Sequence, residues 1–432
     1  NITSPLNPGE AAIPRSNKTL AEYLKPLGYY TAHVGKWHIG GFEADTAGDY
    51  YRPPWNAGFD HCHSTYNVVN TGDPYNNLIS QYDAAVAAND TNAIAAAEAT
   101  LRSDLYWIYP PPAGKEAEAI GGAYNIPFEE ARNDALLRSG DDAKTTGDMT
   151  IQFIREANQQ NKPFFIYSCF HSVHTPLSVI PDYTGLYTGM DSEFLPYFTS
   201  MSAMDHQIGR IRQELRDLGI ADNTIVVFSS DNGPNLKLNK ADDPESRKTY
   251  VPGLQGGRFY YTKIGSPGGY AGYKRWEYEG GLRVPGLIEW PAVITAPRIT
   301  KYPVVTYDFV PLILEVLGIT PEIPMDGDGE KLLALIRNEI PENPDGTLIN
   351  AADERTPMGF HDSSDYAWMT HQHKLVLIDS GDWELYDIVA DEFEENNLAD
   401  PANPDYAPTL LQSMIDDWTV WAAEVEADID AL

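Results

Sequence analysis

Three short polar segments carry the residues that could do chemistry, and each directly follows an apolar run. The segments are residues 35–40 (Gly-Lys-Trp-His-Ile-Gly), 171–176 (His-Ser-Val-His-Thr-Pro) and 229–234 (Ser-Ser-Asp-Asn-Gly-Pro). Lys36 supplies a compact positive charge, and His38 or His174 can donate a proton to a leaving oxygen near neutral pH. Asp231 and Asn232 give a hard cation two oxygen ligands, which favours Ca²⁺ or Mg²⁺ over zinc. Together these residue types suit an anionic ester substrate.

Each segment also has a purely structural interpretation. Asp231-Asn232-Gly-Pro by itself is a turn signature, and His174 before Thr-Pro can simply cap a loop. Lys36 and His38 lie between two glycines, which let a backbone approach a ligand closely. The functional interpretation gains its weight from the combination, because all three segments follow predicted strands.

The elements that must position these segments alternate between helix and strand. Helices are expected over residues 19–27, 149–158 and 201–218, the last from apolar residues recurring at spacings of three and four. Strands are expected over residues 30–34, 164–170 and 224–228. Such units predict an α/β fold with a mostly parallel central sheet flanked by helices. Ligands of open α/β sheets bind beyond the carboxyl ends of the strands, where the three segments lie.

An Ala-rich stretch separates the first unit from the second. It covers about residues 81–101 and is followed by three consecutive prolines at 110–112. This composition predicts a helical insertion within residues 65–145 that carries no recognisable chemistry.

The character of the chain changes again near residues 326–330. Asp-Gly-Asp-Gly-Glu there resembles the start of a calcium loop, but its later ligand positions are wrong, so a Gly-rich turn is expected. An alternating strand over 374–378, a short strand over 383–386 and an amphipathic final helix follow. We therefore expect a main domain over residues 1–345 and a smaller C-terminal α+β subdomain, with antiparallel strands and a helix, over 346–432.

Composition excludes several classes of protein. The 432 residues include 63 acidic and 30 basic side chains, a formal net charge of −33, which disfavours binding to nucleic acids or to an anionic membrane. A hydrophobic content of 42% excludes a disordered chain. No apolar run approaches the roughly 20 residues that span a bilayer. Cys62 and Cys169 are too few for a disulfide framework or a Cys-rich zinc site and are most typical of small apolar residues.

The motifs together resemble the type I sulfatases of the alkaline phosphatase superfamily. Residues 19–25 and 28–40 follow a family signature closely, and the other matching motifs occur in the family's order and spacing. These are residues 174–177, 230–233, 274–285, 384–387 and 394–398. The resemblance covers nearly all of the chain except the insertion. It implies an alkaline phosphatase-like fold and the hydrolysis of a sulfate ester to an alcohol and sulfate.

The resemblance also implies a role for particular residues. Asp231 and Asn232 resemble two ligands of the active-site calcium, for which Mg²⁺ is an alternative. Lys36 and Lys274 resemble the lysines that bind the sulfate oxygens. His174 resembles a sulfate-contacting proton donor, and His38 resembles the histidine that handles a hydrated-aldehyde nucleophile. Four further residues are expected to shape a turn into the segment 286–290: Glu279, Gly280, Gly281 and Arg283.

One departure from the family pattern concerns the nucleophile. In the family this is a formylglycine made from Cys or Ser within Cys/Ser-x-Pro-x-Arg, and the same region supplies an aspartate pair for the metal. Neither Cys62, Cys169 nor any serine of this chain has that context. We therefore expect an N-terminally truncated sulfatase whose formylglycine lies upstream of residue 1 and whose 432 residues alone are inactive. The alternative is a degenerate relative.

Two rival functions stay open. The cation and lysines suit a phosphonate or phosphate ester equally well, and a relative without catalysis could bind sulfated glycans. In each case the expected partner is a sulfated small molecule or carbohydrate, or its phosphorus analogue. The chain opens on Asn1-Ile-Thr without a charged and then apolar leader, so a signal peptide is either absent or already removed. The resemblance implies a secreted or periplasmic protein. The sequence sets neither the leaving alcohol nor an oligomeric state.

Overall fold

The described part of the chain falls into two compact units. The computed structural model describes residues 18–39, 52–66, 69, 71–72, 74–104, 106–119, 123–126, 141–234, 267–319, 329–362, 365–378 and 380–430. We call the part up to Ile220 the N-terminal unit and the part from Ala221 onward the C-terminal unit. Each unit is described by itself.

The N-terminal unit contains a five-stranded sheet with the strand order β4-β3-β2-β1-β5. Strands β1 (Tyr30–Lys36), β2 (His61–Thr65) and β5 (Phe164–Cys169) are parallel. Strands β3 (Trp107–Tyr109) and β4 (Tyr124–Asn125) extend it antiparallel at the β2 side. The three parallel strands therefore end at one common edge.

Both faces of this sheet are covered. On one face, Tyr30, Ala32 and Val34 of β1 pack against Met149 and Phe153 of helix α5 (Asp142–Gln159). On the other face, a second cluster joins the sheet to the short helix α1 (Leu20–Leu24); its members include Ala21, Trp37, Trp55, Phe59, Cys62 and Trp107. Burial of β1 on both sides is what a parallel strand covered by helices requires, so the predicted two-sided packing is confirmed for this strand.

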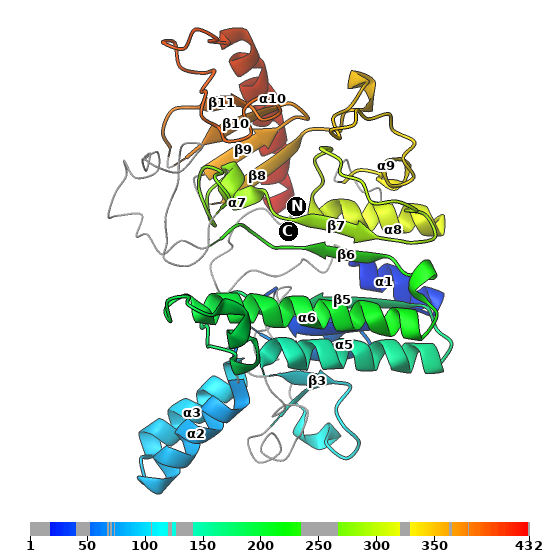
Figure 1. The fold of residues 1–432 in the computed structure, drawn as a ribbon, viewed down its shortest axis with the longest axis vertical. Coiled ribbons are helices and arrows are strands. Elements are labelled where there is room, and N and C mark those ends of the chain that lie inside the picture. Colours follow the sequence, from blue (N-terminus) through cyan, green and yellow to red (C-terminus); the bar gives the residue numbers. More distant parts are fainter. Residues whose placement is uncertain are drawn as a thin grey trace. The chain divides into compact units, whose positions relative to one another are not determined.

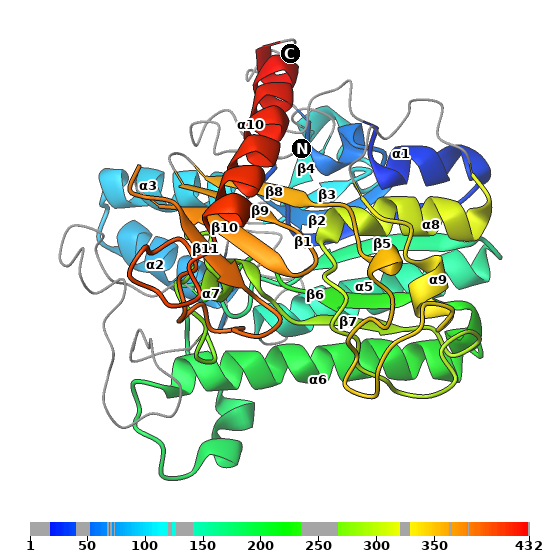
Figure 2. The same ribbon diagram turned by 90° about the horizontal axis from the view of Figure 1, so that it is seen from above.

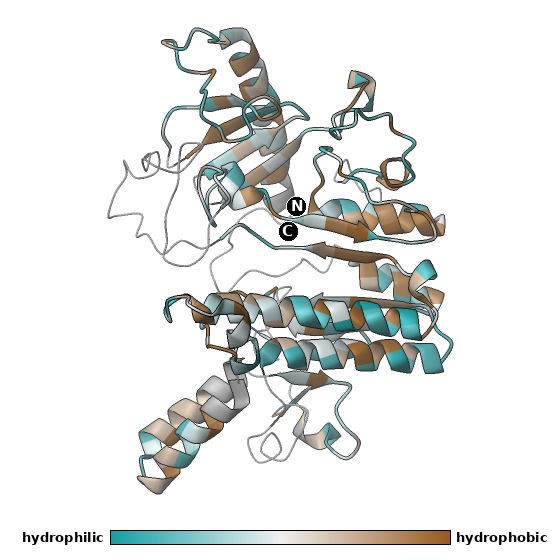
Figure 3. Cartoon of the chain, viewed as in Figure 1, coloured by the Kyte–Doolittle hydropathy of each residue, from teal (hydrophilic) through white to brown (hydrophobic). Residues whose placement is uncertain are grey.

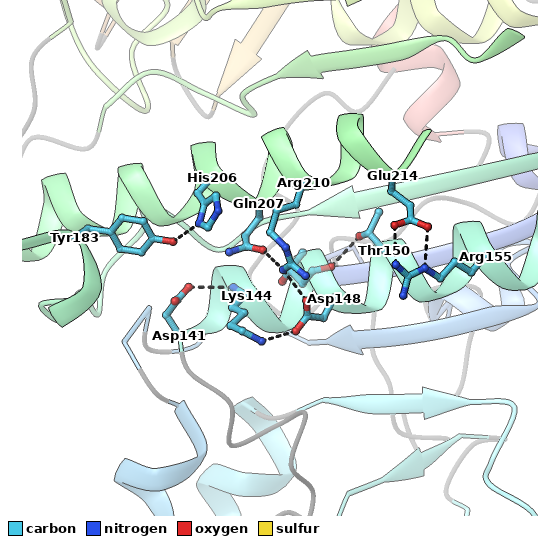
Figure 4. A network of polar contacts seen from close by, with 11 residues as sticks. Asp141, Lys144, Asp148, Thr150, Arg155, Tyr183, His206, Gln207, Arg210 and Glu214 are labelled. Carbon is cyan, nitrogen blue, oxygen red and sulfur yellow. Dashed lines mark hydrogen bonds and ion pairs between the residues drawn. The ribbon is translucent and has the colours of Figure 1, made fainter. Parts of the chain in front are cut away.

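Helix α6 (Leu195–Asp217) packs along α5, and Figure 1 shows the two side by side. Polar side chains join them, as Figure 4 shows in detail. Asp148 lies 2.6 Å from both Lys144 Nζ and Arg210 Nη1. Burial raises the pKa of this carboxyl, but its bonds to Lys144 and Arg210 outweigh burial and hold the pKa below its usual value. Two 2.7 Å bonds between Arg155 and Glu214 add a bidentate ion pair.

The helical structure predicted for the Ala-rich stretch is confirmed as a pair of helices, α2 (Pro74–Ala87) and α3 (Thr91–Asp104). They form the hairpin drawn in blue and cyan in Figure 1. The chain turns at Asn89, whose φ of 51° lies in the left-handed region. Asp90 Oδ1 accepts the backbone N–H groups of Asn92 and Ala93 and so caps α3. The Ala-rich stretch is therefore divided by an Asn-Asp turn.

The C-terminal unit contains two antiparallel sheets. Strands β6 (Val226–Ser229) and β7 (Gly286–Glu289) form the smaller one. The larger one has the order β11-β10-β9-β8, with β8 at Met358–Asp362, β9 at Asp365–Met369, β10 at His373–Leu377 and β11 at Glu384–Asp387. The final helix α10 (Pro408–Asp430) packs on it through Met414, against Trp368, Leu375 and Leu385. Figures 1 and 2 show this helix across the sheet.

Three further α-helices complete the C-terminal unit: α7 (Glu279–Leu282), α8 (Phe309–Leu317) and α9 (Leu333–Ile336). Figure 3 shows α8 as almost uniformly hydrophobic, and its Leu312 is fully buried in a cluster with Leu332, Leu333 and Leu335. Short 3₁₀ helices occur in both units, at Lys25–Leu27, Pro54–Asn56, Glu116–Glu118, Pro181–Tyr187, Ala221–Asn223, Thr306–Asp308 and Ala351–Asp353. No helix of the described residues is long and apolar enough to cross a membrane.

The expected fold class is confirmed, but the strand expected over 224–228 is β6, which pairs antiparallel with β7 in a separate two-stranded sheet. The core strands of the main sheet are parallel and flanked by helices, and antiparallel strands with a helix lie near the C-terminus. The predicted alternation in β10 is wrong, because Lys374, Leu375 and Val376 are all buried. No disulfide joins Cys62, which is buried, to Cys169, which is partly buried. Most of the predicted Gly-rich turn at 326–330 lies outside the described residues, and the boundary at residue 345 stays a prediction.

Candidate active site

Lys36 and His38 lie at the edge where the parallel strands of the N-terminal unit end. Lys36 is the last residue of β1 and stands opposite Thr65, the last residue of β2. Beyond the strands the pairing continues, because the N–H of Trp37 donates to Thr65 O and the N–H of His38 donates to Tyr66 O, both at 2.9 Å. Backbone bonds thus place the segment after β1 against the segment after β2.

Gly35 has a different purpose from the one that the sequence suggested. Its φ is 88°, and a Cβ atom built on it would lie 1.9 Å from the carbonyl oxygen of Cys169 in β5. Only glycine fits at this contact. The close approach that Gly35 permits is therefore to the neighbouring strand and not to a ligand, while Gly40 lies outside the described residues.

His174 lies in the loop that leaves β5 at the same edge. Its N–H donates to the carbonyl oxygen of His171 at 2.8 Å. Its Nδ1 lies 2.6 Å from the carbonyl oxygen of Thr175, and since a carbonyl oxygen only accepts, Nδ1 carries a proton. Nε2 is then the ring nitrogen that gains or loses a proton, as a proton donor to a leaving oxygen requires.

A buried chain of polar side chains lies behind His174 and was not predicted as part of the site. His171 Nδ1 lies 2.8 Å from Asp142 Oδ2, and its Nε2 lies 2.6 Å from the hydroxyl of Thr65. Tyr106 donates its hydroxyl to Asp142 Oδ1 at 2.5 Å. All four side chains are fully buried. The chain links the end of β2 to the loop that carries His174, and its members are too far apart in sequence for spacing to reveal them.

Two other histidines of this sheet carry no charge near neutral pH. His33 and His63 are buried, and desolvation lowers the pKa of each to about 3. His33 Nδ1 lies 2.6 Å from the Ser64 hydroxyl. Both rings are therefore neutral and supply no positive charge to an anion at this edge.

In the C-terminal unit, Asp231 and Asn232 follow β6 directly, in a turn of residues 231–234 that we call the Asn232 turn. Asn232 Nδ2 donates to the carbonyl oxygen of Gly233 at 2.8 Å, so the amide oxygen Oδ1 is the atom that can bind a cation. Asp231 is exposed. Its carboxylate and the Asn232 amide are the oxygen ligands that Ca²⁺ and Mg²⁺ prefer.

Lys274 is held beside the Asn232 turn by its backbone. It lies in a segment of residues 271–281 that we call the Lys274 loop. The N–H of Lys274 donates to Pro234 O at 3.0 Å, and the N–H of Gly233 donates to Gly281 O at 2.9 Å. A Cβ atom on Gly233 would lie 1.9 Å from Gly280 O, so this contact also requires glycine.

The structure thus gathers the six predicted residues into two sets, one in each unit. Lys36, His38 and His174 share one sheet edge, and Asp231, Asn232 and Lys274 share one turn and the loop beside it. The described residues contain no group of three or more His, Cys, Asp or Glu side chains placed to hold a metal ion. Asp231 and Asn232 fit calcium by ligand type, and they would supply two of the six to eight oxygens that it takes.

Comparison with known protein families shows which family the chain belongs to. The family model described as Sulfatase matches residues 2–319, the stretch that holds all six residues. The chain belongs to the sulfatase family. A second model, described as N-sulphoglucosamine sulphohydrolase, C-terminal, matches residues 269–418, which include the Lys274 loop and the larger antiparallel sheet. The family that the motifs resembled is therefore confirmed.

Individual sulfatases support the same assignment. The chain is 27% identical to Arylsulfatase D of Homo sapiens over 356 residues, which are 77% of this chain and 55% of that protein. It is 26% identical to N-acetylgalactosamine-6-O-sulfatase of Bacteroides thetaiotaomicron over 413 residues, 90% of this chain and 75% of that protein. The solved structure of Ps i-CgsB in complex with k-i-k-neocarrahexaose has the same fold, with a TM-score of 0.65 at 20% identity and coverage of 96% and 76%. The chain spans about half the length of Arylsulfatase D and similar curated relatives.

Proposed function

We propose that the protein hydrolyses sulfate esters, ROSO₃⁻ + H₂O to ROH + HSO₄⁻. The match of the sulfatase family over residues 2–319 carries this proposal. Within it, the grouping of Lys36 with His174 at one sheet edge, and of Lys274 with Asp231 and Asn232 at one turn, supplies the residue types that the reaction needs.

Each residue has a stated role in this proposal. Lys36 and Lys274 bind the sulfate oxygens, and His174 donates a proton from Nε2 to the leaving alcohol. Asp231 and Asn232 would hold calcium, which when bound neutralises charge that develops on the sulfuryl group. His38 acts at the nucleophile, which the resemblance expects to be a formylglycine.

The proposed substrate is a sulfated carbohydrate. One similar protein is named N-acetylgalactosamine-6-O-sulfatase, and a structure of the same fold was solved in complex with k-i-k-neocarrahexaose. A sugar ester also suits His174, because an alkoxide leaving group needs a proton more than a phenolate does.

A comparison of three ester classes tests the reaction. The full-length protein is assayed with an aryl sulfate, an aryl phosphate and an aryl phosphonate of the same phenol, with and without added Ca²⁺. We expect the highest kcat/KM for the sulfate and its loss on chelation. Preference for a phosphorus ester contradicts the proposal, and binding of sulfated glycans without turnover of any ester identifies a non-catalytic relative. The 432-residue chain alone is expected to be inactive, because it contains no Cys/Ser-x-Pro-x-Arg.

A further inference from the structure

Three charged side chains are buried together in the C-terminal unit. Lys374 Nζ in β10 lies 2.8 Å from Glu279 Oε1 and 3.0 Å from Glu394 Oε1. The exposed fractions of the three side chains are 0%, 5% and 0%. We call them the Lys374 cluster. Removing such charges from water costs several kcal/mol per ion, and the cost is not always repaid in stability. Burial of these three charges therefore indicates a role beyond stability.

The Lys374 cluster is hydrogen-bonded to the backbone of the Lys274 loop. Glu394 Oε2 accepts the backbone N–H of Glu279 at 2.9 Å, so one carboxylate bonds both the lysine and the loop. The next two residues of the loop, Gly280 and Gly281, make backbone hydrogen bonds within the loop and to the Asn232 turn. Gly280 N–H donates to Ala271 O at 2.6 Å, and Gly281 O accepts the N–H of Gly233. Glu279, a member of the cluster, is therefore two positions from Gly281, whose carbonyl oxygen holds the Asn232 turn.

Packing joins the same two regions. Tyr273, Trp276 and Tyr278 of the Lys274 loop form one buried cluster with Val376 of β10 and Tyr386 of β11. The hydroxyls of Tyr278 and Tyr386 both donate to Glu384 Oε2, the former at 2.7 Å. The motifs at 384–387 and 394–398, which the proposed chemistry does not use, thus lie against the loop that carries Lys274.

The protonation of the Lys374 cluster depends on all three of its members, so replacing one can change the charge of another. Burial raises the pKa of Glu394 to about 7, although Lys374 beside it acts in the opposite direction. Burial alone would lower the pKa of Lys374, but Glu279 and Glu394 outweigh it and raise that pKa. Lys374 is therefore protonated near neutral pH, and Glu394 can take up a proton if the lysine is removed.

We propose that Lys374 and Glu394 are positioning residues for the Lys274 loop and the Asn232 turn of the C-terminal unit. By holding the backbone of Glu279, they fix the Lys274 loop and, through Gly281 and Pro234, the Asn232 turn. The inference rests on the proposed function, because that function assigns Lys274 to the sulfate and Asn232 to the cation. It gives the C-terminal subdomain a task in catalysis without contact to substrate.

Hydrogen–deuterium exchange tests the placement without any need for activity. In the variants Lys374→Met and Glu394→Ala, peptides that contain the amides of Gly233, Lys274 and Gly281 should exchange at least tenfold faster than in the wild type. Glu394→Gln keeps an oxygen that can accept the Glu279 N–H, so it should restore most of the protection. Unchanged exchange in both disruptive variants overturns the proposal, and so does a Gln variant as fast as the Ala variant.

A matched control separates positioning from stability. Arg355 and Asp308 form another ion pair in the same unit, with Nη1 and Oδ2 3.0 Å apart and side chains 2% and 0% exposed. Arg355→Met should lower the melting temperature to a similar degree, yet leave the exchange of Gly233 and Lys274 unchanged. Equal acceleration in this control overturns the proposal, because general destabilisation would then explain the effect.

A functional measurement distinguishes failure of this inference from failure of the proposed function. In the active full-length enzyme, Lys374→Met should lower kcat/KM for the aryl sulfate at least tenfold and raise the Ca²⁺ concentration for half-activation, whereas Arg355→Met should do neither. Accelerated exchange without any loss of activity in Lys374→Met overturns the positioning role. A wild-type enzyme that does not hydrolyse sulfate esters overturns the proposed function, while the exchange result stands by itself.

Discussion

Lys274 shows how little of a functional residue's placement depends on its own side chain. Its backbone N–H bonds to Pro234, and the loop around it is held by the buried Glu279. The side chain itself is partly exposed. Lys274 can therefore be replaced with little effect on the fold. A change in activity on its replacement then tests the role proposed for its side chain.

We expect Lys274→Ala to lower kcat/KM of the full-length enzyme by tens-fold or more, and Lys36→Ala to do the same. The loss corresponds to about 2–4 kcal/mol for a charge contact to the transition state. Steady-state kinetics with an aryl sulfate measures it, and Lys331→Ala, an exposed lysine of the C-terminal unit, is the control. Wild-type kinetics in either variant would show that the lysine is not at the sulfate.

His63 is a residue whose burial predicts a response to acid. Neither of its ring nitrogens has a hydrogen-bond partner among the described residues, and its ring packs 4.3 Å from that of Tyr106. Burial lowers its pKa from 6.5 to about 3 in the folded protein. The unfolded chain therefore binds the proton more readily, and stability falls as the pH drops from about 6.5 towards 3.

Replacement of His63 by Phe should remove this acid sensitivity while keeping an aromatic ring of similar size. Between pH 7 and pH 5 the wild type should lose about 2 kcal/mol more stability than His63→Phe, from a linkage of about 1.4 kcal/mol per pH unit. Urea unfolding at the two pH values measures the difference. An equal loss of stability in the wild type and in His63→Phe would contradict the explanation.

At the scale of elements, helices α5 and α6 each contain one glycine, and the two differ in importance because Gly147 is buried and Gly209 is exposed. A Cβ atom on Gly147 of α5 would lie 2.8 Å from Gln207 of α6, which is buried. A Cβ atom on Gly209 of α6 would meet nothing within 4 Å. Gly147 is therefore needed for the close approach of the helices. Gly209 only lowers the stability of α6, because glycine in a helix interior is less stable than alanine.

The two alanine variants should accordingly shift stability in opposite directions. Gly209→Ala should raise it by about 0.5–1 kcal/mol, the usual gain in a helix interior. Gly147→Ala should lower it by about 1–3 kcal/mol, because overpacking against Gln207 exceeds that gain. Thermal unfolding of both variants measures the difference, and a stabilised Gly147→Ala would show that the helices can move apart freely.

At the scale of the whole molecule, the net charge of −33 sets the conditions under which an anionic substrate arrives. The average field repels a sulfate ester, while in the proposed site Lys36 and Lys274 attract it locally. Salt screens the long-range field more than it weakens close contacts. The protein should therefore work best on sparsely charged sulfates or in salty surroundings.

An ionic-strength series tests this expectation. Raising the salt from about 10 mM to about 150 mM shortens the Debye length from about 30 Å to about 8 Å. We expect kcat/KM for a densely sulfated polymer to rise several-fold over this range, and that for a monosulfated sugar to rise less. Activity on the polymer that is indifferent to salt, or that falls with it, would count against repulsion by the whole surface.

Local patterns predicted most of the elements and the six candidate residues. Apolar spacing in 201–218 placed α6, and the Ala-rich stretch placed the insertion, because each helix depends mainly on its own residues. The alternation expected in β10 was wrong, since Lys374 is buried by partners at positions 279 and 394. Asp142 and Thr65, which bond His171, were likewise absent from the predicted site.

The sequence by itself determined the family, the order of helices and strands, and the residue types offered to an anionic ester, since these depend on motifs whose residues are neighbours in the chain. The tertiary structure alone decided which distant groups hold those motifs. Gly35 admits the strand β5, His171 joins Asp142 to Thr65, and Lys374 ties the C-terminal subdomain to the Lys274 loop. Such contacts arise only when folding brings together residues about 30 to 130 positions apart, and no local spacing records them.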